Sequence, residues 1–515
     1  MFAPFRLKDP RHLAAGAAAF GTALATALLG IFARADTPER PQPPTGPVEL
    51  RLLGVNDFHG HLEPPREDVG GAASLTAHLD AATLPGRTIR VHAGDMVGTS
   101  PLISSWFHDE PAIEAANQMG FDVGTVGNHE FDEGGDELLR LLRGGRRTGP
   151  AAVKLDGAGG LVNTSSPSFS GASFPYLGAN TVDAGSGRLM LPPYRIIERA
   201  GVRLGFIGVT TTSTPRWVLP RLADRYRFLD LSDSVNRWAA ELERKGVEAI
   251  VVLAHVGAPS QKGDGSRATG PVVEESRQMS DAVDVVIAGH SHSELNLRAP
   301  NASGRGSKLV VEANSYGTAF DQVDLTLDRT SGEVLSKSAV IVSTTHSAVV
   351  PDAGSSELVD RYATRIAPVA DQVLGVARSP LSARRGLGKL AAEAQRRLAR
   401  ADIALVNRSS FRGTIDAGPI TYAEVFEAQA YDHPVLRMTM SGAGVLEATR
   451  GAIYRAARRP GPIEPSETYT VAANELFATR NGLPALAAAA RRGQVVGTEV
   501  EALSDYLKSG PGPYP

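Results

Sequence analysis

The stretch that decides the fold is VELRLLGVNDFHGHLEP, residues 48–64. An apolar run, Val48–Val55, ends there in a polar segment that carries Asp57 and His59. Side chains two residues apart on an extended chain face the same side, so this pair can bind one metal ion together. We therefore expect a buried strand that presents a metal-binding pair at its carboxyl end.

The same arrangement recurs four times further along the chain, each time just past an apolar run that resembles a strand. Binding sites in open α/β sheets form at the carboxyl ends of strands, so five segments should meet at one edge. Asp95 follows Gly94, and a carboxylate can bridge two ions with its two oxygens. We predict a centre of two divalent ions with seven ligands: Asp57, His59, Asp95, Asn128, His255, His290 and His292.

Mixed imidazole and oxygen ligands suit Zn, Mn, Fe or Co rather than Ca. Two such ions, about 3.5 to 4 Å apart, acidify bound water and hold both oxygens of an in-line displacement, so hydroxide attack on a phosphate ester is the expected reaction. His129 follows Asn128 directly and should point away from the ion, while Asp132 can orient its imidazole and keep it cationic. We predict that His129 and Asp132 form a catalytic dyad.

Around these motifs, short apolar runs alternate with helix-like segments, which is typical of an α/β layered domain. The expected strands are Val48–Val55, Thr88–His92, Val123–Val126, Val202–Val209, Val247–Leu253, Ala282–Ala288, Lys308–Ala313 and Phe320–Leu327. The expected helices are Pro111–Met119, Gly134–Leu142, Leu231–Lys245, Val272–Met279 and Ser355–Val373. Residues 145–172, rich in Gly, Ser, Thr and Pro, indicate a surface insertion.

Composition narrows the class of protein. A chain of 515 residues is too long for one ordinary core, so we expect two domains. Hydrophobic residues make up 42% and charged residues 21%, as in soluble globular proteins. A net charge of −3 gives no reason to expect a nucleic-acid polymer as partner. Because the chain has no cysteine, disulfides, thiol nucleophiles and thiolate zinc sites are excluded.

The first 35 residues are predicted to be a signal peptide. Three cationic residues precede an uncharged apolar run, Leu13–Ala33. A small-residue pattern of the kind found at cleavage sites ends at Ala35, after which we expect cleavage. The protein would then be exported, to the periplasm or outside the cell, with no membrane span left. The alternative is an uncleaved anchor, since the run could just cross a bilayer. The Pro-rich residues 36–47 indicate a linker.

Five sequence blocks resemble, in order, those of the calcineurin-like metallophosphoesterases: GVNDFHGHLEP, HAGDMVGTSPL, VGNHEFDEG, VLAHVG and AGHSHSE. More narrowly, the chain looks like the bacterial 5′-nucleotidase/UDP-sugar hydrolase family, because residues 404–435 are similar to that family's C-terminal domain. The resemblance implies a four-layer α/β/β/α sandwich over residues 48–345, a linker helix over 346–375 and a smaller α/β substrate-binding domain over 376–510.

The resemblance also implies how the ligands are shared. Asp57, His59, Asp95 and His292 would hold one ion, and Asp95, Asn128, His255 and His290 the other. In the C-terminal domain it implies substrate contacts from Asn407 and Arg412 and base stacking by Tyr431. Two departures stand out: Ser409 and Ser410 replace a glycine pair, and Leu483 stands where the family has a second stacking ring.

The sequence thus predicts an exported phosphohydrolase with two metal ions, similar to 5′-nucleotidases, that acts on a nucleotide or related small phosphate ester. One alternative is a 2′,3′-cyclic nucleotide phosphodiesterase, or a hydrolase of another small phosphate ester. An alternative from another class is a metal-dependent nucleotide-binding protein without turnover, against which the intact His129 and Asp132 argue. The sequence carries no signal for the oligomeric state.

Overall fold

The computed structural model describes residues 46–149, 152–155, 160–263, 268–449, 454–457, 461–480, 482–510 and 512–514. The predicted signal peptide and nearly all of the predicted linker lie outside these residues. The part from Gly46 onward forms one compact unit. Among the described residues, no helix has the length and apolar character needed to cross a membrane.

The first sheet is built around the strand that opens the fold. Its six strands run in the order β17-β16-β1-β2-β3-β6. β1 pairs with β2 in parallel and with β16 in antiparallel orientation. Their bounds are β1 (Pro47–Val55), β2 (Thr88–His92), β3 (Val123–Thr125), β6 (Tyr176–Leu177), β16 (Ala319–Asp328) and β17 (Val334–Ser343).

The second sheet has seven strands in the order β12-β14-β15-β13-β11-β9-β8. The pairs β9–β11, β11–β13 and β13–β15 are parallel, so the carboxyl ends of these four strands lie at one edge. Every residue of β11 is buried, as expected of a strand covered on both faces. The bounds are β8 (Tyr194–Arg199), β9 (Val202–Thr210), β11 (Ala249–His255), β12 (Gln261–Gly263), β13 (Val283–Ala288), β14 (Glu294–Pro300) and β15 (Ser307–Ala313).

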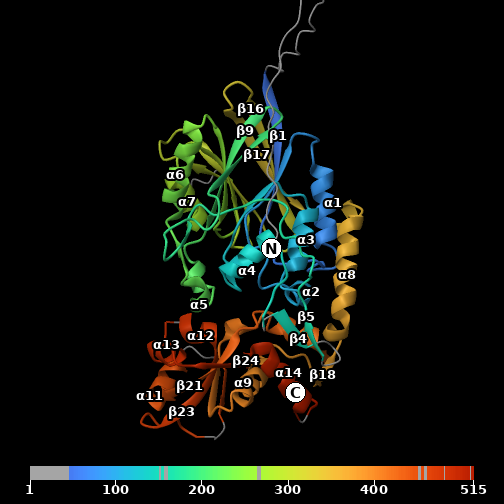
Figure 1. The fold of residues 1–515 in the computed structure, drawn as a ribbon, viewed down its shortest axis with the longest axis vertical. Helices are drawn as coiled ribbons and strands as arrows, with labels where there is room; N and C mark the ends of the chain where they lie inside the picture. Colours follow the sequence, from blue (N-terminus) through green and yellow to red (C-terminus); the bar gives the residue numbers. More distant parts are fainter. Residues whose placement is uncertain are drawn as a thin grey trace, which may run out of the picture. The chain divides into compact units, whose positions relative to one another are not determined.

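Helices cover the outer faces of both sheets (Figure 1). On the first sheet these are α1 (Ala72–Ala82), α3 (Glu110–Gln118) and α8 (Ala353–Ala370); on the second, α6 (Leu231–Arg244) and α7 (Pro271–Gln278). A separate core joins the two sheets, with Leu50 and Val91 on one side and Phe206 and Val251 on the other. The predicted four-layer α/β/β/α arrangement is therefore confirmed.

Shorter elements complete this domain: α2 (Leu102–Ser105), α4 (Gly135–Arg143), α5 (Pro220–Ala223), β7 (Thr181–Asp183), β10 (Tyr226–Phe228), and the 3₁₀ turns η1 (His129–Phe131), η3 (Thr214–Arg216) and η4 (His346–Ala348). The predicted insertion, residues 145–172, contains a two-stranded hairpin, β4 (Val153–Leu155) and β5 (Leu161–Asn163). It is fixed to α3, because the Ser165 hydroxyl and the Ser166 N–H both donate to Glu110.

The C-terminal domain is a smaller α/β unit, as predicted. Its main sheet has five strands in the order β22-β19-β23-β21-β24, and β18 pairs with β20. The strands are β18 (Val373–Ala377), β19 (Ile403–Val406), β20 (Gly418–Thr421), β21 (Pro434–Ser441), β22 (Tyr454–Ala457), β23 (Thr468–Asn474) and β24 (Gln494–Thr498). The helical elements are α9 (Leu387–Leu398), η5 (Arg408–Ser410), α10 (Tyr422–Ala428), α11 (Gly442–Ala448), α12 (Glu475–Arg480), α13 (Pro484–Ala490) and α14 (Glu499–Ser509).

Candidate metal centre and active site

The loops after β1 and β2 run side by side past the sheet edge. The N–H of Asp57 donates to the Gly94 carbonyl, and the N–H of His59 donates to the Asp95 carbonyl, both at 3.0 Å. Asp57, His59 and Asp95 all have left-handed backbones, with φ of 50°, 48° and 50°. This conformation costs a residue with a side chain about 1 to 3 kcal/mol and is concentrated at functional sites. The strain therefore lies where the candidate ligands converge.

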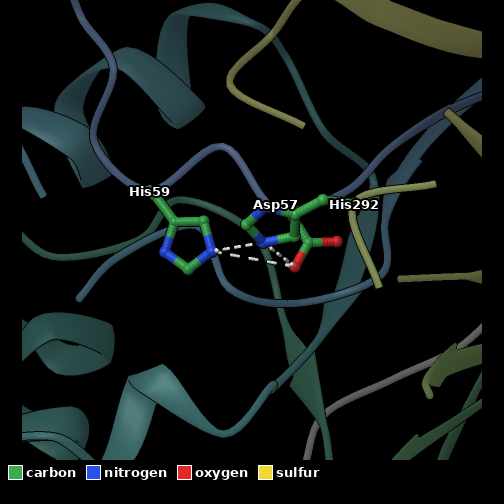
Figure 2. Close-up of side chains that lie close together, drawn as sticks. All are labelled: Asp57, His59 and His292. Atoms are coloured by element: carbon green, nitrogen blue, oxygen red, sulfur yellow. Dashed lines mark hydrogen bonds and ion pairs between the residues drawn. The ribbon is translucent and has the colours of Figure 1, made fainter. Parts of the chain in front are cut away.

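The first ligand group joins Asp57, His59 and His292 (Figure 2). The Nε2 atoms of His59 and His292 are 3.2 Å apart, and Oδ1 of Asp57 lies 3.3 Å from His292 Nε2 and 3.7 Å from His59 Nε2. Asp57 is fully buried, and its Oδ1 has no hydrogen-bond partner among the described residues. Its other oxygen accepts hydrogen bonds from the side-chain amide of Asn56 and from the backbone N–H of His290. Three donor atoms thus face one point.

The second group joins Asp95, His255 and His290, with ligand atoms within 4.8 Å of one another. His255 Nε2 lies 3.0 Å from Oδ2 of Asp95 and 3.2 Å from Oδ1 of Asn128. In the part of the chain that the structure describes, the buried Nδ2 of Asn128 has no hydrogen-bond partner. The same Asp95 oxygen is 3.7 Å from His59 Nε2. Asp95 therefore stands between the two groups, in the position of a ligand that two ions would share.

The far nitrogens of two imidazoles are fixed by backbone carbonyls. His59 Nδ1 donates to Gly98, and His255 Nδ1 donates to Ala93, both at 2.8 Å. A carbonyl can only accept, so both Nδ1 atoms carry a proton and both Nε2 atoms face the site. When His255 is neutral, its Nε2 and the Asn128 oxygen are two acceptors 3.2 Å apart, and a cation between them removes the repulsion.

The pKa values of the site also fit a bound cation. Although burial opposes ionisation, the histidines around Asp57 and Asp95 hold the pKa of both carboxyls well below the usual range. Burial lowers the pKa of His255, but Asp95 outweighs it and raises the pKa to about 10. The pKa of His290 falls to about 4 through burial and the neighbouring His255. Buried carboxylates that stay ionised and favour positive charge beside them, among imidazole and oxygen donors, fit divalent metal ions.

The predicted dyad lies beside this centre. His129 Nδ1 is 2.8 Å from Oδ2 of Asp132, and the His129 N–H donates to Oδ1 of Asp95. Burial lowers the pKa of His129, but the charges of Asp132 and Asp95 outweigh it and raise the pKa to about 9. The His129 and His59 rings meet edge to face at 5.2 Å. The geometry therefore presents a cationic imidazole, oriented by Asp132, next to the candidate ligands.

A buried carboxylate ties two of these loops together. Glu130 accepts the backbone N–H groups of Asp95, Met96 and Gly127 at 2.6 to 3.0 Å. Burial, reinforced by the nearby charge of Asp95, raises the pKa of Glu130 to about 8. Glu130 thus holds the loop of Asp95 against the turn that carries Asn128.

Two of the predicted substrate residues lie close to the first ligand group. Arg412 Nη2 donates to the Tyr316 hydroxyl at 2.8 Å, and its guanidinium lies 5.2 Å from the centre of the Tyr431 ring. Tyr316 in turn meets the His292 ring at 5.2 Å. Asn407 instead bonds within its own turn, where its amide donates to Ser409.

Two family models match the chain. Residues 50–294 match the calcineurin-like phosphoesterases, and residues 372–461 match the 5′-nucleotidase C-terminal domain. The chain belongs to the calcineurin-like phosphoesterases with a 5′-nucleotidase C-terminal domain. The predicted family is confirmed, and the family is one of phosphoester hydrolases. Proteins of this family use divalent metal ions.

Relatives of this phosphoesterase differ in length and name. The endonuclease YhcR of Bacillus subtilis is 32% identical over 86% of this chain, and the cell wall protein Lmo0130 of Listeria monocytogenes is 32% identical over 78%. The chain spans only 38% and 56% of these two proteins. Among solved structures, the 5′-nucleotidase precursor of Thermus thermophilus shares the fold, with a TM-score of 0.68, 24% identity, and 90% and 96% of the two chains covered.

The structure adds two aromatic residues that the sequence prediction missed. Tyr316 follows β15, and Trp217 follows β9, with its ring 6.0 Å from that of His290. Tyr316 comes just after a parallel strand of the second sheet, so the strand-end rule could have found it, whereas Trp217 lies beyond the turn η3 and outside the reach of that rule. Phe477, near the segment where the family has a second ring, is only 4% exposed and packs into the C-terminal core.

Proposed function

We propose that this phosphoesterase is an exported phosphohydrolase with two metal ions that releases phosphate from 5′-nucleotides or related small esters. The observation that carries the proposal is Asp95. Its Oδ2 lies 3.0 Å from His255 in one ligand group and 3.7 Å from His59 in the other. A carboxylate shared between two groups of imidazoles and oxygens suits a pair of Zn, Mn, Fe or Co ions.

The seven proposed ligands would hold the ions as two sets that share Asp95. When bound, two divalent ions supply Lewis acidity, which acidifies water and stabilises the charge on phosphoryl oxygens. The chain's own groups do the rest. The His129 imidazolium, oriented by Asp132, stabilises the phosphoryl oxygens or gives its proton to the leaving oxygen. Arg412 binds the phosphate or ribose, Tyr431 stacks on the base, and Asn407 shapes the loop beside them.

A second candidate is a phosphodiester substrate, such as a 2′,3′-cyclic nucleotide. It is favoured by the name of the 32% identical relative, an endonuclease, and by the replacement of the glycine pair by Ser409 and Ser410. Export is supported by the leader sequence and by the relative named as a cell wall protein.

Hydrolysis, followed as product formation by chromatography, tests the proposal. The chain starting at Asp36 is stripped of metal, given Mn or Zn, and assayed with 5′-AMP, UDP-glucose, 2′,3′-cyclic AMP, an aryl phosphodiester and single-stranded DNA. We expect 5′-AMP to be the preferred ester and the stripped protein to be inactive. Preference for a diester would favour the second candidate. No release from any ester with either metal would refute the proposal.

A further inference from the structure

The side chain of Trp217 is unusually exposed for a large apolar ring. It is 49% exposed, whereas Trp106, another of the three tryptophans, is 7% exposed. Indole rings usually bury most of their area, and exposed aromatic residues are enriched at binding surfaces. Trp217 therefore calls for a partner that covers its ring.

The loop that carries the exposed ring is held by hydrogen bonds of its backbone. The backbone N–H of Trp217 donates to the Thr214 carbonyl at 3.0 Å, and the Thr214 hydroxyl donates to the Thr211 carbonyl at 2.8 Å. The backbone N–H of Thr211 donates to the carbonyl of His255, a proposed metal ligand. The next residue, Val218, is only 1% exposed. A ring on a fixed backbone loses less entropy when a ligand stacks on it than a ring on a mobile loop would.

The ring stands at the rim of the second ligand group. It meets the ring of His290 at 6.0 Å with an interplanar angle of 73°. At the first ligand group, Tyr316 meets His292, and Arg412 links Tyr316 to Tyr431. Each ligand group therefore has an aromatic side chain beside it.

Trp217 is also close in the chain to contacts with the C-terminal domain. Four residues later, Arg221 lies 3.4 Å from Glu475 of α12. Asp224 lies 3.3 Å from Arg480 at the end of the same helix. Trp217 therefore lies near the segment through which the metallophosphoesterase domain contacts the C-terminal domain, beside a path that a substrate bound to both could take. Within α12, Phe477 is buried and offers no ring to it.

We infer that Trp217 is a substrate-contacting residue whose exposed indole face stacks on the base of a nucleotide with its phosphate at the ligand groups. The inference rests on the proposed function and deepens it, because it makes recognition of the base depend on the metal-binding domain as well. The ligand class is a planar aromatic group joined to a phosphate. Esters without such a group gain nothing from Trp217.

Steady-state kinetics of Trp217→Ala and Trp217→Phe on the metal-loaded enzyme test the inference with 5′-AMP and ribose 5-phosphate. Base stacking predicts that Trp217→Ala raises KM for 5′-AMP about 5- to 150-fold. KM for ribose 5-phosphate should change less than about twofold, and Trp217→Phe should recover most of the loss. Trp238→Phe is the matched control, because Trp238 packs on Tyr194 on the second sheet's outer face. Equal effects on both esters, or none, would overturn the inference.

Fluorescence gives a readout that does not need turnover. In the variant with Trp106→Phe and Trp238→Phe, Trp217 is the sole tryptophan, and added adenosine should quench its emission saturably. The quench should be absent in the single variant Trp217→Phe, in which Trp106 and Trp238 supply the emission. If the wild type hydrolyses no nucleotide but adenosine still quenches, the proposed function fails and the stacking surface stands. If 5′-AMP is hydrolysed without a quench, only the inference about Trp217 fails.

Discussion

Asp132→Asn removes the charge that orients the proposed catalytic imidazole while it keeps the side chain's shape. The bond to His129 spans 2.8 Å, and the two side chains are 17% and 27% exposed, so solvent screens the pair only in part. A hydrogen bond between charged groups is worth about 1.5 to 3 kcal/mol. At a factor of ten per 1.36 kcal/mol, loss of that amount from the transition state lowers kcat about 10- to 150-fold.

The assay is kcat and kcat/KM for 5′-AMP between pH 6 and 10, with metal in excess. The pKa of His129 is raised to about 9, so the imidazolium is present below that pH and is lost as the pH rises through it. Asp132→Asn should lower this pKa and move the alkaline limb to lower pH. Asp136→Asn is the matched control, because its 78% exposed side chain pairs with Arg225 away from the dyad. Activity within about threefold of wild type, with an unmoved limb, would refute the assigned role.

Three further predictions concern stability, metal binding and substrate binding. Burial raises the pKa of Glu499 from 4.5 to about 8, so the unfolded chain releases this proton at lower pH than the folded chain does, and the free energy of unfolding falls as the pH rises between those values. Glu499→Gln should abolish the part of this fall that Glu499 causes, up to roughly 5 kcal/mol, when urea unfolding at pH 5 is compared with unfolding at pH 8.5. Glu130→Ala leaves three buried backbone N–H groups without an acceptor. It should lower the free energy of unfolding by about 3 kcal/mol, measured by thermal unfolding, and weaken metal binding 10- to 100-fold, measured by titration. Arg412→Ala breaks the bond to Tyr316 and should raise KM for 5′-AMP roughly tenfold, with a smaller change in kcat, in steady-state kinetics.

Much of the metallophosphoesterase domain could be predicted because its central strands, such as β9 and β11, are buried on both faces and so read as apolar runs. Thr88–His92 was predicted with the observed bounds, and Leu231–Lys245 is one residue longer than α6. The candidate ligands follow from the same signal, since they come just after such runs. The match to the family confirms the domain type, while the individual ligand assignments stay predictions.

What the sequence did not predict depends on packing between distant segments. α1 has several small residues and a weak apolar stripe, and its burial between the first sheet and α8 is visible only in the fold. Tyr316 gains its position from a left-handed turn, with φ of 61°, and from Arg412 nearly a hundred residues away. Trp217 looks like a core residue in sequence, and its exposure is visible only in the fold.

The most direct test of the central claim is the number of metal ions per chain, measured by mass spectrometry after dialysis against Mn or Zn. Because Asp95 faces both ligand groups, the account predicts two ions in the wild type and less than one in Asp95→Ala. One ion or none in the wild type, or two ions kept by Asp95→Ala, would contradict the account.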